Sequence, residues 1–516
     1  MHPEIQELKN FRNAFYEILL KSKDAIMNLL DALTSSGHKC KSVVELSTSK
    51  WFERKYSSVT KAISKLSKVN WKEIMELIFH TVTKGLEKTH TFMIDATPNK
   101  RQFAKKLADR YITYSPNPDP GNKPICAGNQ YSLLGVMAPT NEPDKSERLV
   151  PISSARVSSD DKGNELGMLQ IKEAIVSFGL NTTLCKSVGD TLYSSNKCRK
   201  IATECPNLVH ISRLSISRTV YLQPSANEDN KTSGRPKEYG ATMSLKDTKT
   251  HVPCDNEEQM TLLLGRKKQQ YVITIKRWNN VLLRGTKTFK SSSHPIDIIQ
   301  ITVCDKKNKL LYKNPLWISI LGSRRSEVSS KEAYLDYKSR FGQEHMFRFL
   351  KQNLLMNCYK TVNIDYEEMW WKLVTVAYAQ LYLAKNIATK VIQPWEKYLP
   401  ENKNDDEGQD KYSCNPSQTQ RGFSHLLTQI GTPAKPCISR GKSSGRKIGE
   451  TQIKRKSHEI IFKNKNKKNV ISWDSEKMTK ISDPLKTQRL ITGIKTTIEN
   501  LNLKLTFLEK TLIDTG

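Results

Sequence analysis

Nowhere in its 516 residues does the sequence carry an uninterrupted apolar run of the roughly 18 residues that a membrane-spanning helix needs. Its first residues, MHPEIQELKN, contain no apolar core of the kind found in a secretion signal. The ten cysteines form no CxxC pair, so the sequence predicts reduced thiols and no disulfide framework. These absences make a membrane a poor partner and lead us to expect a cytoplasmic protein.

Acidic residues are also scarce relative to basic ones. The chain has 52 Asp and Glu against 83 Lys and Arg, which gives a formal net charge of +31 and a pI near 9.6. A chain with this charge is expected to bind a polyanion, and without a membrane the best candidate is nucleic acid. Its length is too great for one simple domain.

Among the potential zinc ligands, one loose cluster stands out. Cys198, Cys205 and His210 lie close in sequence, but their spacing matches no common zinc site. We therefore interpret these three residues as structural.

Helical periodicity dominates the first part of the chain. Apolar residues recur at helical spacing within residues 15–33 and again within residues 71–86. We therefore predict a helical N-terminal domain over residues 1–88, and we expect this domain to bind DNA.

Residues 89–200 combine strand-like and helical patterns. Strand patterns occur in THTFMIDATPNK, YSLLGVMAP and RLVPISSARVSS, and a helical pattern and the strand TTLCKSVGD follow. The first strand is predicted to end at Asp95 and the last at Asp190. This order predicts an α/β layer, and functional side chains collect where the strands of such a layer end. Asp95 and Asp190 are therefore expected to be neighbours.

The following segment, residues 201–310, favours a β-rich insertion. Within it, Arg235 and Lys237 lie in the basic stretch TSGRPKEYG, which either reaches a DNA groove or forms a simple turn. Residues 311–395 are predicted to complete the α/β layer. Trp370 and Trp371 in this part are interpreted as core residues and not as a platform for stacking bases.

A polar stripe marks the segment YKSRFGQEHMFRFLKQ, which is predicted to be helical. At about 100° per residue, Tyr337, Arg340, Glu344 and Lys351 fall within a sector about 60° wide. Large apolar residues flank this sector. Arg340 and Glu344 are four residues apart, so one interpretation is an ordinary ion-paired helix face. The other is a surface directed at a charged ligand.

The last two segments differ in composition from the rest. Residues 396–470 are predicted to be a linker and a basic arm, rich in Gly, Pro, Ser and Lys, whose cations bind DNA phosphates without sequence preference. Residues 471–516 carry apolar residues at alternating steps of three and four, which predicts a C-terminal helix. Both a coiled coil and packing onto the protein's own surface are compatible with this pattern.

Three acids, Asp95, Asp190 and Glu344, are the candidate catalytic residues. If they converge, their carboxylates repel one another unless cations lie between them, and an all-oxygen site suits Mg²⁺ or Mn²⁺. Two such ions activate a water or a 3′-hydroxyl and stabilise the leaving oxygen in phosphodiester cleavage. In such a site Tyr337, Arg340 and Lys351 would hold the DNA backbone.

These residues resemble a known family, the DDE transposases of bacterial insertion sequences, in the group with the Tyr-x2-Arg-x3-Glu-x6-Lys (YREK) signature. The match at Tyr337, Arg340, Glu344 and Lys351 is complete. The resemblance extends to the surroundings of the two aspartates, in MIDATPNKRQFAKKLADR and SVGDTLYSS, and to the GTPAKP segment of the arm.

The resemblance implies an RNase H-like catalytic core in which Asp95, Asp190 and Glu344 bind two divalent ions. It implies that a homodimer cleaves double-stranded DNA at the ends of an insertion sequence and transfers the strands to target DNA. Arg213 and Arg218 follow the second aspartate in a basic stretch similar to one in the family, and each is interpreted either as a backbone contact or as surface charge.

Two alternatives share much of this pattern. A catalytically idle, domesticated transposase that only binds DNA would keep the charge and the fold but would be expected to lose an acid, and all three are present. Another RNase H-like DNA nuclease would need the three acids without Tyr337 and Lys351.

Overall fold

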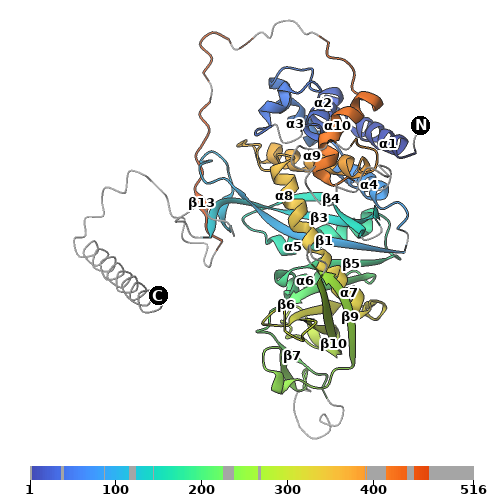
Figure 1. The fold of residues 1–516 in the computed structure, drawn as a ribbon. Coiled ribbons are helices and arrows are strands. Elements are labelled where there is room, and N and C mark those ends of the chain that lie inside the picture. The colour runs from blue at the N-terminus through green and yellow to red at the C-terminus, as the bar shows by residue number, and fades with distance from the viewer. Residues whose placement is uncertain are drawn as a thin grey trace, which may run out of the picture. The chain divides into compact units, whose positions relative to one another are not determined.

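Two neighbouring parallel strands, β1 (Thr89–Lys100) and β5 (Leu184–Gly189), lie at the centre of one large mixed sheet. The computed structural model describes residues 3–36, 40–86, 88–115, 124–142, 145–224, 237–264, 269–389, 391, 414–438, 445, 447–451 and 453–463. The strand order across the sheet is β13, β2, β3, β1, β5, β6, β12, β11, β10, β9, and β4 pairs with β3 outside this path. The fold class is mixed α/β (Figure 1).

The elements around β1 follow the predicted order. β3 (Ile125–Glu142) and β4 (Lys145–Val157) form a long antiparallel hairpin beside β1, and α5 (Gly163–Ser177) leads from β4 to β5. The three predicted strands, the helix and the further strand are all present, but a fourth strand lies between the first two. This additional strand is β2 (Arg110–Tyr114), a short strand that pairs with β3 and was not predicted.

The strands after β5 continue the same sheet. β6 (Leu208–Leu214) is parallel to β5, and β12 (Leu316–Leu321) pairs with β6 in antiparallel fashion. β11 (Ile296–Asp305), β10 (Gln269–Val281) and β9 (Asn256–Leu264) extend the sheet further. Residues 201–310 are thus rich in strands, as predicted, but most of these strands prolong the central sheet.

Short elements complete this region. They are α6 (Asn196–Thr203), the strand pair β7 (Thr219–Tyr221) and β8 (Thr242–Ser244), and the short 3₁₀ helices η3 (Thr191–Ser194), η4 (Thr248–Thr250), η5 (Ser291–Ser293) and η6 (Arg325–Glu327).

The predicted helices of the first 88 residues are present. They are α1 (Pro3–Ile18), α2 (Lys23–Thr34), α3 (Ser57–Lys65) and α4 (Trp71–Val82), with the 3₁₀ turns η1 (Val44–Thr48) and η2 (Leu66–Lys68) between them. All four helices contact α9 (Ile364–Leu383), around which they gather in Figure 1. Trp370 and Trp371 of α9 are fully buried, so their interpretation as core residues is confirmed.

One helix, α10 (Pro416–Ile430), lies in the segment predicted to be a linker and arm. Asn415 caps it through a capping box with Gln418, and Phe423 is among the side chains it buries against α2 and α9. Gly422 is required for this packing, because a Cβ there would lie 2.2 Å from the carbonyl oxygen of Thr389. The local signal was the Asn-Pro-x-Gln start, which is a helix N-terminus pattern.

A second part of the predicted arm pairs with the edge of the sheet. β13 (Ile460–Ile461) lies parallel to β2, and Lys463 Nζ donates to the carbonyl oxygen of Ser158 at 2.8 Å. This pairing covers an edge that would otherwise expose unpaired backbone groups. The predicted helix over residues 471–516 lies outside the described residues.

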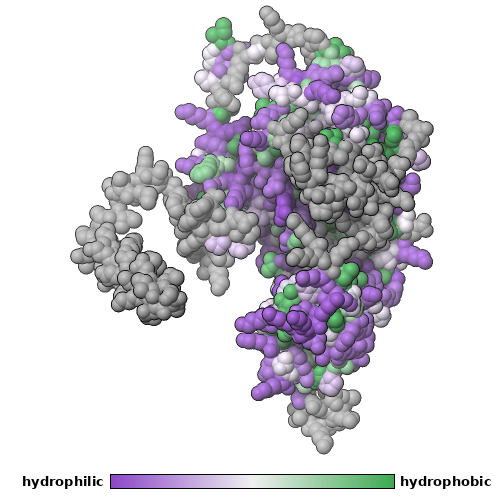
Figure 2. Space-filling view, in the orientation of Figure 1, coloured by the Kyte–Doolittle hydropathy of each residue, from purple (hydrophilic) through white to green (hydrophobic). Residues whose placement is uncertain are grey.

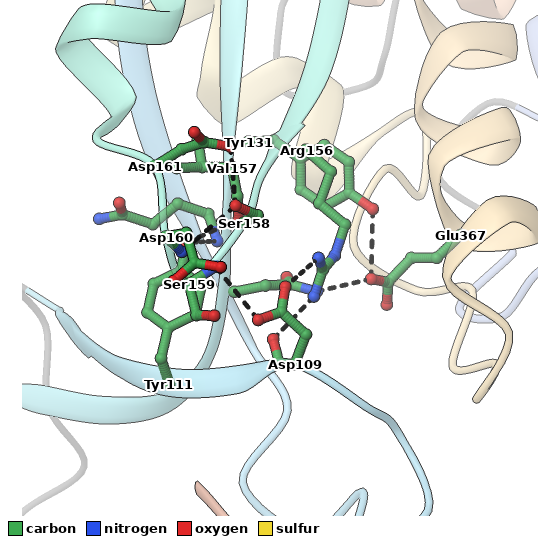
Figure 3. A network of polar contacts seen from close by, with 12 residues as sticks. Asp109, Tyr111, Tyr131, Arg156, Val157, Ser158, Ser159, Asp160, Asp161 and Glu367 are labelled. Carbon is green, nitrogen blue, oxygen red and sulfur yellow. Dashed lines mark hydrogen bonds and ion pairs between the residues drawn. The ribbon is translucent and has the colours of Figure 1, made fainter. Parts of the chain in front are cut away.

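A buried polar network joins α9 to the sheet (Figure 3). Glu367 of α9 is 1% exposed, and it accepts hydrogen bonds from Asn129 Nδ2 at 2.8 Å and from the Tyr131 hydroxyl at 3.2 Å. Its other carboxylate oxygen pairs with Arg101 Nη1 at 2.5 Å. The Tyr131 ring stacks on Trp371 with a centroid distance of 3.9 Å. These contacts fix α9 against β3 and against Arg101, which directly follows β1.

The coloured part of the face drawn in Figure 2 is mainly hydrophilic, with scattered hydrophobic residues, and this holds also for the part formed by the strands beyond β6. Among the helices of the described ranges, none has both the length and the apolar character of a membrane-crossing segment.

Candidate active site

The pairing of β1 with β5 places Asp95 and Asp190 side by side. In the parallel register Met93 lies opposite Val188, and each aspartate follows its paired residue by two positions. The prediction that Asp95 and Asp190 are neighbours is therefore confirmed, and the charge of Asp190 acts on the carboxyl of Asp95.

The predicted end of the first strand is wrong. β1 continues past Asp95 to Lys100, paired with β3 throughout. Its pairing with β5 stops at Met93, so the β5 side of β1 is open from there on. A proline is tolerated at such a one-sided position, which explains why Pro98 does not end the strand.

The turn after β5 holds Asp190 in place. Its carboxylate accepts a hydrogen bond from the backbone N–H of Leu192 at 2.9 Å and so caps η3. The preceding Gly189 leaves room for the ring of Tyr193, because a Cβ at this position would lie 2.6 Å from that side chain.

The predicted single helix with the polar stripe consists of two helices, α7 (Ser330–Ser339) and α8 (Phe341–Gln352), joined at Arg340. At the joint the N–H of Gln343 donates to the carbonyl oxygen of Arg340 at 2.9 Å. This bond spans three residues, as in a 3₁₀ helix, and not four, as in an α-helix. The backbone of Arg340 remains helical, with φ −54° and ψ −26°. The helix is therefore interrupted at this residue, but the chain does not turn back on itself. Its guanidinium lies 3.7 Å from a carboxylate oxygen of Asp95.

One cleft of about 960 Å³ brings several predicted residues together. Tyr337, Arg340 and Glu344 form one wall, and Arg213 lies at the end of β6 on another. Thr191, which follows Asp190, also lines the cleft. The cleft therefore opens beside the two aspartates.

The cleft also has residues that the sequence analysis does not single out. Tyr312 and Lys313, from the β11–β12 connection, and Lys338, next to Tyr337, line it.

Other predicted DNA contacts lie elsewhere. Arg218 and Lys237 are exposed and are not among the described residues that line the cleft. Arg235 lies outside the described residues.

Lys351 faces β1 and does not line the open cleft. Its Nζ donates to Thr97 Oγ1 at 2.5 Å and lies 3.5 Å from the carbonyl oxygen of Pro98. Burial lowers the pKa of Lys351 to about 8, and the charge of Asp95 opposes this shift. A phosphate contact for Lys351 stays a prediction.

The acids influence one another through charge. Burial raises the pKa of Asp95 to about 6, and the charges of Asp190 and Glu344 act in the same direction, whereas Arg340 opposes the shift. Arg340 therefore partly compensates the negative charge that the three carboxylates bring together.

The donor set suits a hard divalent cation, because Asp95, Asp190 and Glu344 offer only oxygen. Within the described ranges, however, no three His, Cys, Asp or Glu side chains are gathered closely enough to hold a metal ion. The two aspartates are already neighbours. Glu344 lies on the facing helix, close enough that its charge helps to raise the pKa of Asp95.

His210 has a structural role, as interpreted from the sequence. Its Nδ1 shares a hydrogen bond with Ser187 Oγ at 2.8 Å, and its Nε2 lies 3.1 Å from the carbonyl oxygen of Tyr193. Burial lowers the pKa of His210 to about 4, which favours the neutral ring.

The raised pKa of Asp95 predicts a stability change for Asp95→Asn in metal-free protein. An acid whose pKa is raised on folding binds its proton more tightly when folded, so its favourable contribution is complete below pH 3.8 and is lost as the pH rises through about 6. Asn imitates the neutral form. We expect its melting temperature to exceed the parent's by a few degrees above neutral pH and to approach the parent's towards pH 4, as measured by thermal unfolding.

The matched control for this experiment is Asp160→Asn, which changes an exposed aspartate. It should shift the melting temperature little at any pH. A difference between Asp95→Asn and parent that does not change with pH would contradict the raised pKa.

Neither a comparison with protein-family models nor a search of curated proteins finds a match for this chain.

Proposed function

We propose that this protein is a DDE transposase that cleaves DNA at the ends of an insertion sequence and transfers the strands to target DNA. The main supporting observation is that Asp95 of β1 and Asp190, directly after β5, are neighbours and are faced by Arg340 and Glu344 of the α7–α8 segment. A formal charge of +31 supports a DNA partner. The proposal includes a homodimer, acting on DNA in the bacterial cytoplasm.

An RNase H-like core is part of the proposal. It is supported by the antiparallel strands β1, β3 and β4, the helix α5 and the parallel strands β5 and β6, and by acids on β1 and directly after the adjacent strand β5. The helix α8, which carries Glu344, packs beside this part of the sheet although it is distant from both aspartates in sequence.

Asp95, Asp190 and Glu344 would hold the divalent ions. When bound, these ions supply an activated oxygen nucleophile and stabilise the leaving oxygen. Arg340, which lines the cleft, would bind a DNA phosphate there, because a guanidinium matches the geometry of phosphate oxygens. Arg213 and Tyr337 line the same cleft and would position the backbone.

Chelation tests this proposal. Cleavage of DNA that carries the element's ends should require Mg²⁺ or Mn²⁺ and should stop in EDTA. End binding should largely persist in EDTA, because the cationic surface acts on phosphates without a metal. Cleavage assays and gel-shift binding on the same samples measure both, and undiminished cleavage in EDTA would contradict the proposal.

A second candidate, an RNase H-like nuclease without strand transfer, is favoured by one contact. Lys351 is bound to Thr97 of β1 and does not line the cleft. A structural contact alone therefore explains this lysine, without the DNA-binding role that the YREK signature implies. Joining of a cleaved 3′ end to target DNA distinguishes the two, since only the transposase makes this product. Tight end binding without any cleavage would indicate the idle, domesticated form.

A further inference from the structure

The α7–α8 segment has to be placed accurately against the sheet. Asp95 and Asp190 are aligned by the backbone pairing of β1 with β5. Glu344, in contrast, lies on the helix α8, which the backbone hydrogen bonds of the sheet do not hold. Its distance from the aspartates therefore depends on side-chain contacts between the helix and the sheet.

A buried lysine makes such a contact at the start of the segment. Lys186 lies on β5, four residues before Asp190, and its side chain is 6% exposed. Its Nζ lies 2.6 Å from Glu332 Oε1 and 2.7 Å from Asp336 Oδ2. Both acids belong to α7 and are four residues apart, so they lie on the same face of the helix.

The other end of the segment has a corresponding contact. Lys351, in the last turn of α8, donates to Thr97 Oγ1 of β1 at 2.5 Å. The segment is thus attached to β5, the strand that leads to Asp190, and to β1, the strand that carries Asp95. Glu344 lies between the two attachments.

We propose that Lys186 is a positioning residue that sets the α7–α8 segment, and with it Arg340 and Glu344, at its distance from Asp190. Its effect on catalysis depends on the proposed function, whereas its effect on the position of α7 does not.

The chemistry of the contact suits this role. Burial alone would lower the pKa of Lys186, but Asp336 and Glu332 outweigh it and keep the pKa above the ordinary value, so the ammonium stays charged. An apolar residue would be buried at lower cost, but it would not select one register of α7. Without the ammonium, Glu332 and Asp336 would repel each other across one helical turn. The contact therefore favours a single position of the helix.

Three variants test the proposal: Lys186→Met, the double variant Glu332→Gln/Asp336→Asn, and the triple variant that combines them. We expect the first two to lower the single-turnover rate of end cleavage by on the order of 10²-fold, as for a misplacement of about 1 Å. The triple variant should be no slower than the slower of these, because all three remove the same contact. Affinity for end DNA should change much less than the rate.

Hydrogen exchange measures how firmly the helix is held against the sheet, with or without catalysis. Backbone amides of residues 330–352 should exchange faster in Lys186→Met, while those of β6 and α1 should not change. The matched control is Lys172→Met, which removes an exposed pair with Glu204 at 2.6 Å and should leave exchange and cleavage as in the parent.

The outcomes separate the two proposals. Faster exchange limited to residues 330–352 supports the positioning role even if the parent cleaves no DNA, in which case only the proposed function fails. Unchanged exchange in this segment would overturn the positioning role. So would faster exchange throughout the chain with cleavage falling only in parallel with the melting temperature, since Lys186 would then contribute to stability alone.

Discussion

Glu344→Gln should abolish strand cleavage and leave binding to the element's ends intact. The substitution keeps the size of the side chain but removes the negative charge that helps to hold a divalent ion. A catalytic metal contributes several kcal/mol to the stabilisation of the transition state, and about 4 kcal/mol corresponds to about 10³-fold in rate. Single-turnover cleavage and gel-shift binding with the same end DNA measure the two effects.

The control for this prediction is Glu173→Gln, which changes an exposed glutamate of α5. It should cleave as the parent does. The ordinary ion-pair interpretation of Arg340 and Glu344 predicts another result, in which cleavage falls only as far as thermal stability falls. A Glu344→Gln protein that cuts at close to the parent rate would remove Glu344 from the catalytic set.

Local patterns were sufficient to find many of the elements around the site. β1, β3, β4, α5 and β5 each have a pattern of apolar residues that is visible within a short window of sequence. The adjacency of Asp95 and Asp190 followed from the tendency of functional residues to collect at neighbouring strand ends. That expectation was confirmed although β1 does not end at Asp95.

What the sequence could not predict depends on contacts between distant segments. The pairing of β12 with β6, which joins the two halves of the sheet, connects residues about a hundred positions apart. The bond from Lys351 to Thr97 and the pairing of Lys186 with α7 join residues that are even further apart in sequence. A pattern within a short window of sequence does not predict such contacts. Taken alone, each lysine has the pattern of an exposed residue, and α7 has that of an ordinary helix.

Glu367→Ala should destabilise the fold more than a typical substitution. Glu367 is fully buried and pairs with Arg101, whose side chain is 3% exposed. Removing the carboxylate leaves a buried guanidinium without its counter-charge, which costs about 3–5 kcal/mol. Asn129 and the Tyr131 hydroxyl lose their acceptor as well. We expect a loss of this size in the free energy of unfolding, measured by denaturant titration.

The neighbouring residue provides a matched control. Glu368 pairs with Lys372 one turn along α9 at 3.1 Å, and about a quarter of each side chain is exposed, at 26% and 23%. Glu368→Ala should therefore cost no more than about 0.5 kcal/mol. Replacing both buried partners, in Arg101→Met/Glu367→Leu, should recover part of the loss because no buried charge is then left unpaired. If Glu367→Ala destabilised the protein no more than Glu368→Ala, the network between α9 and the sheet would not be what holds this helix in place.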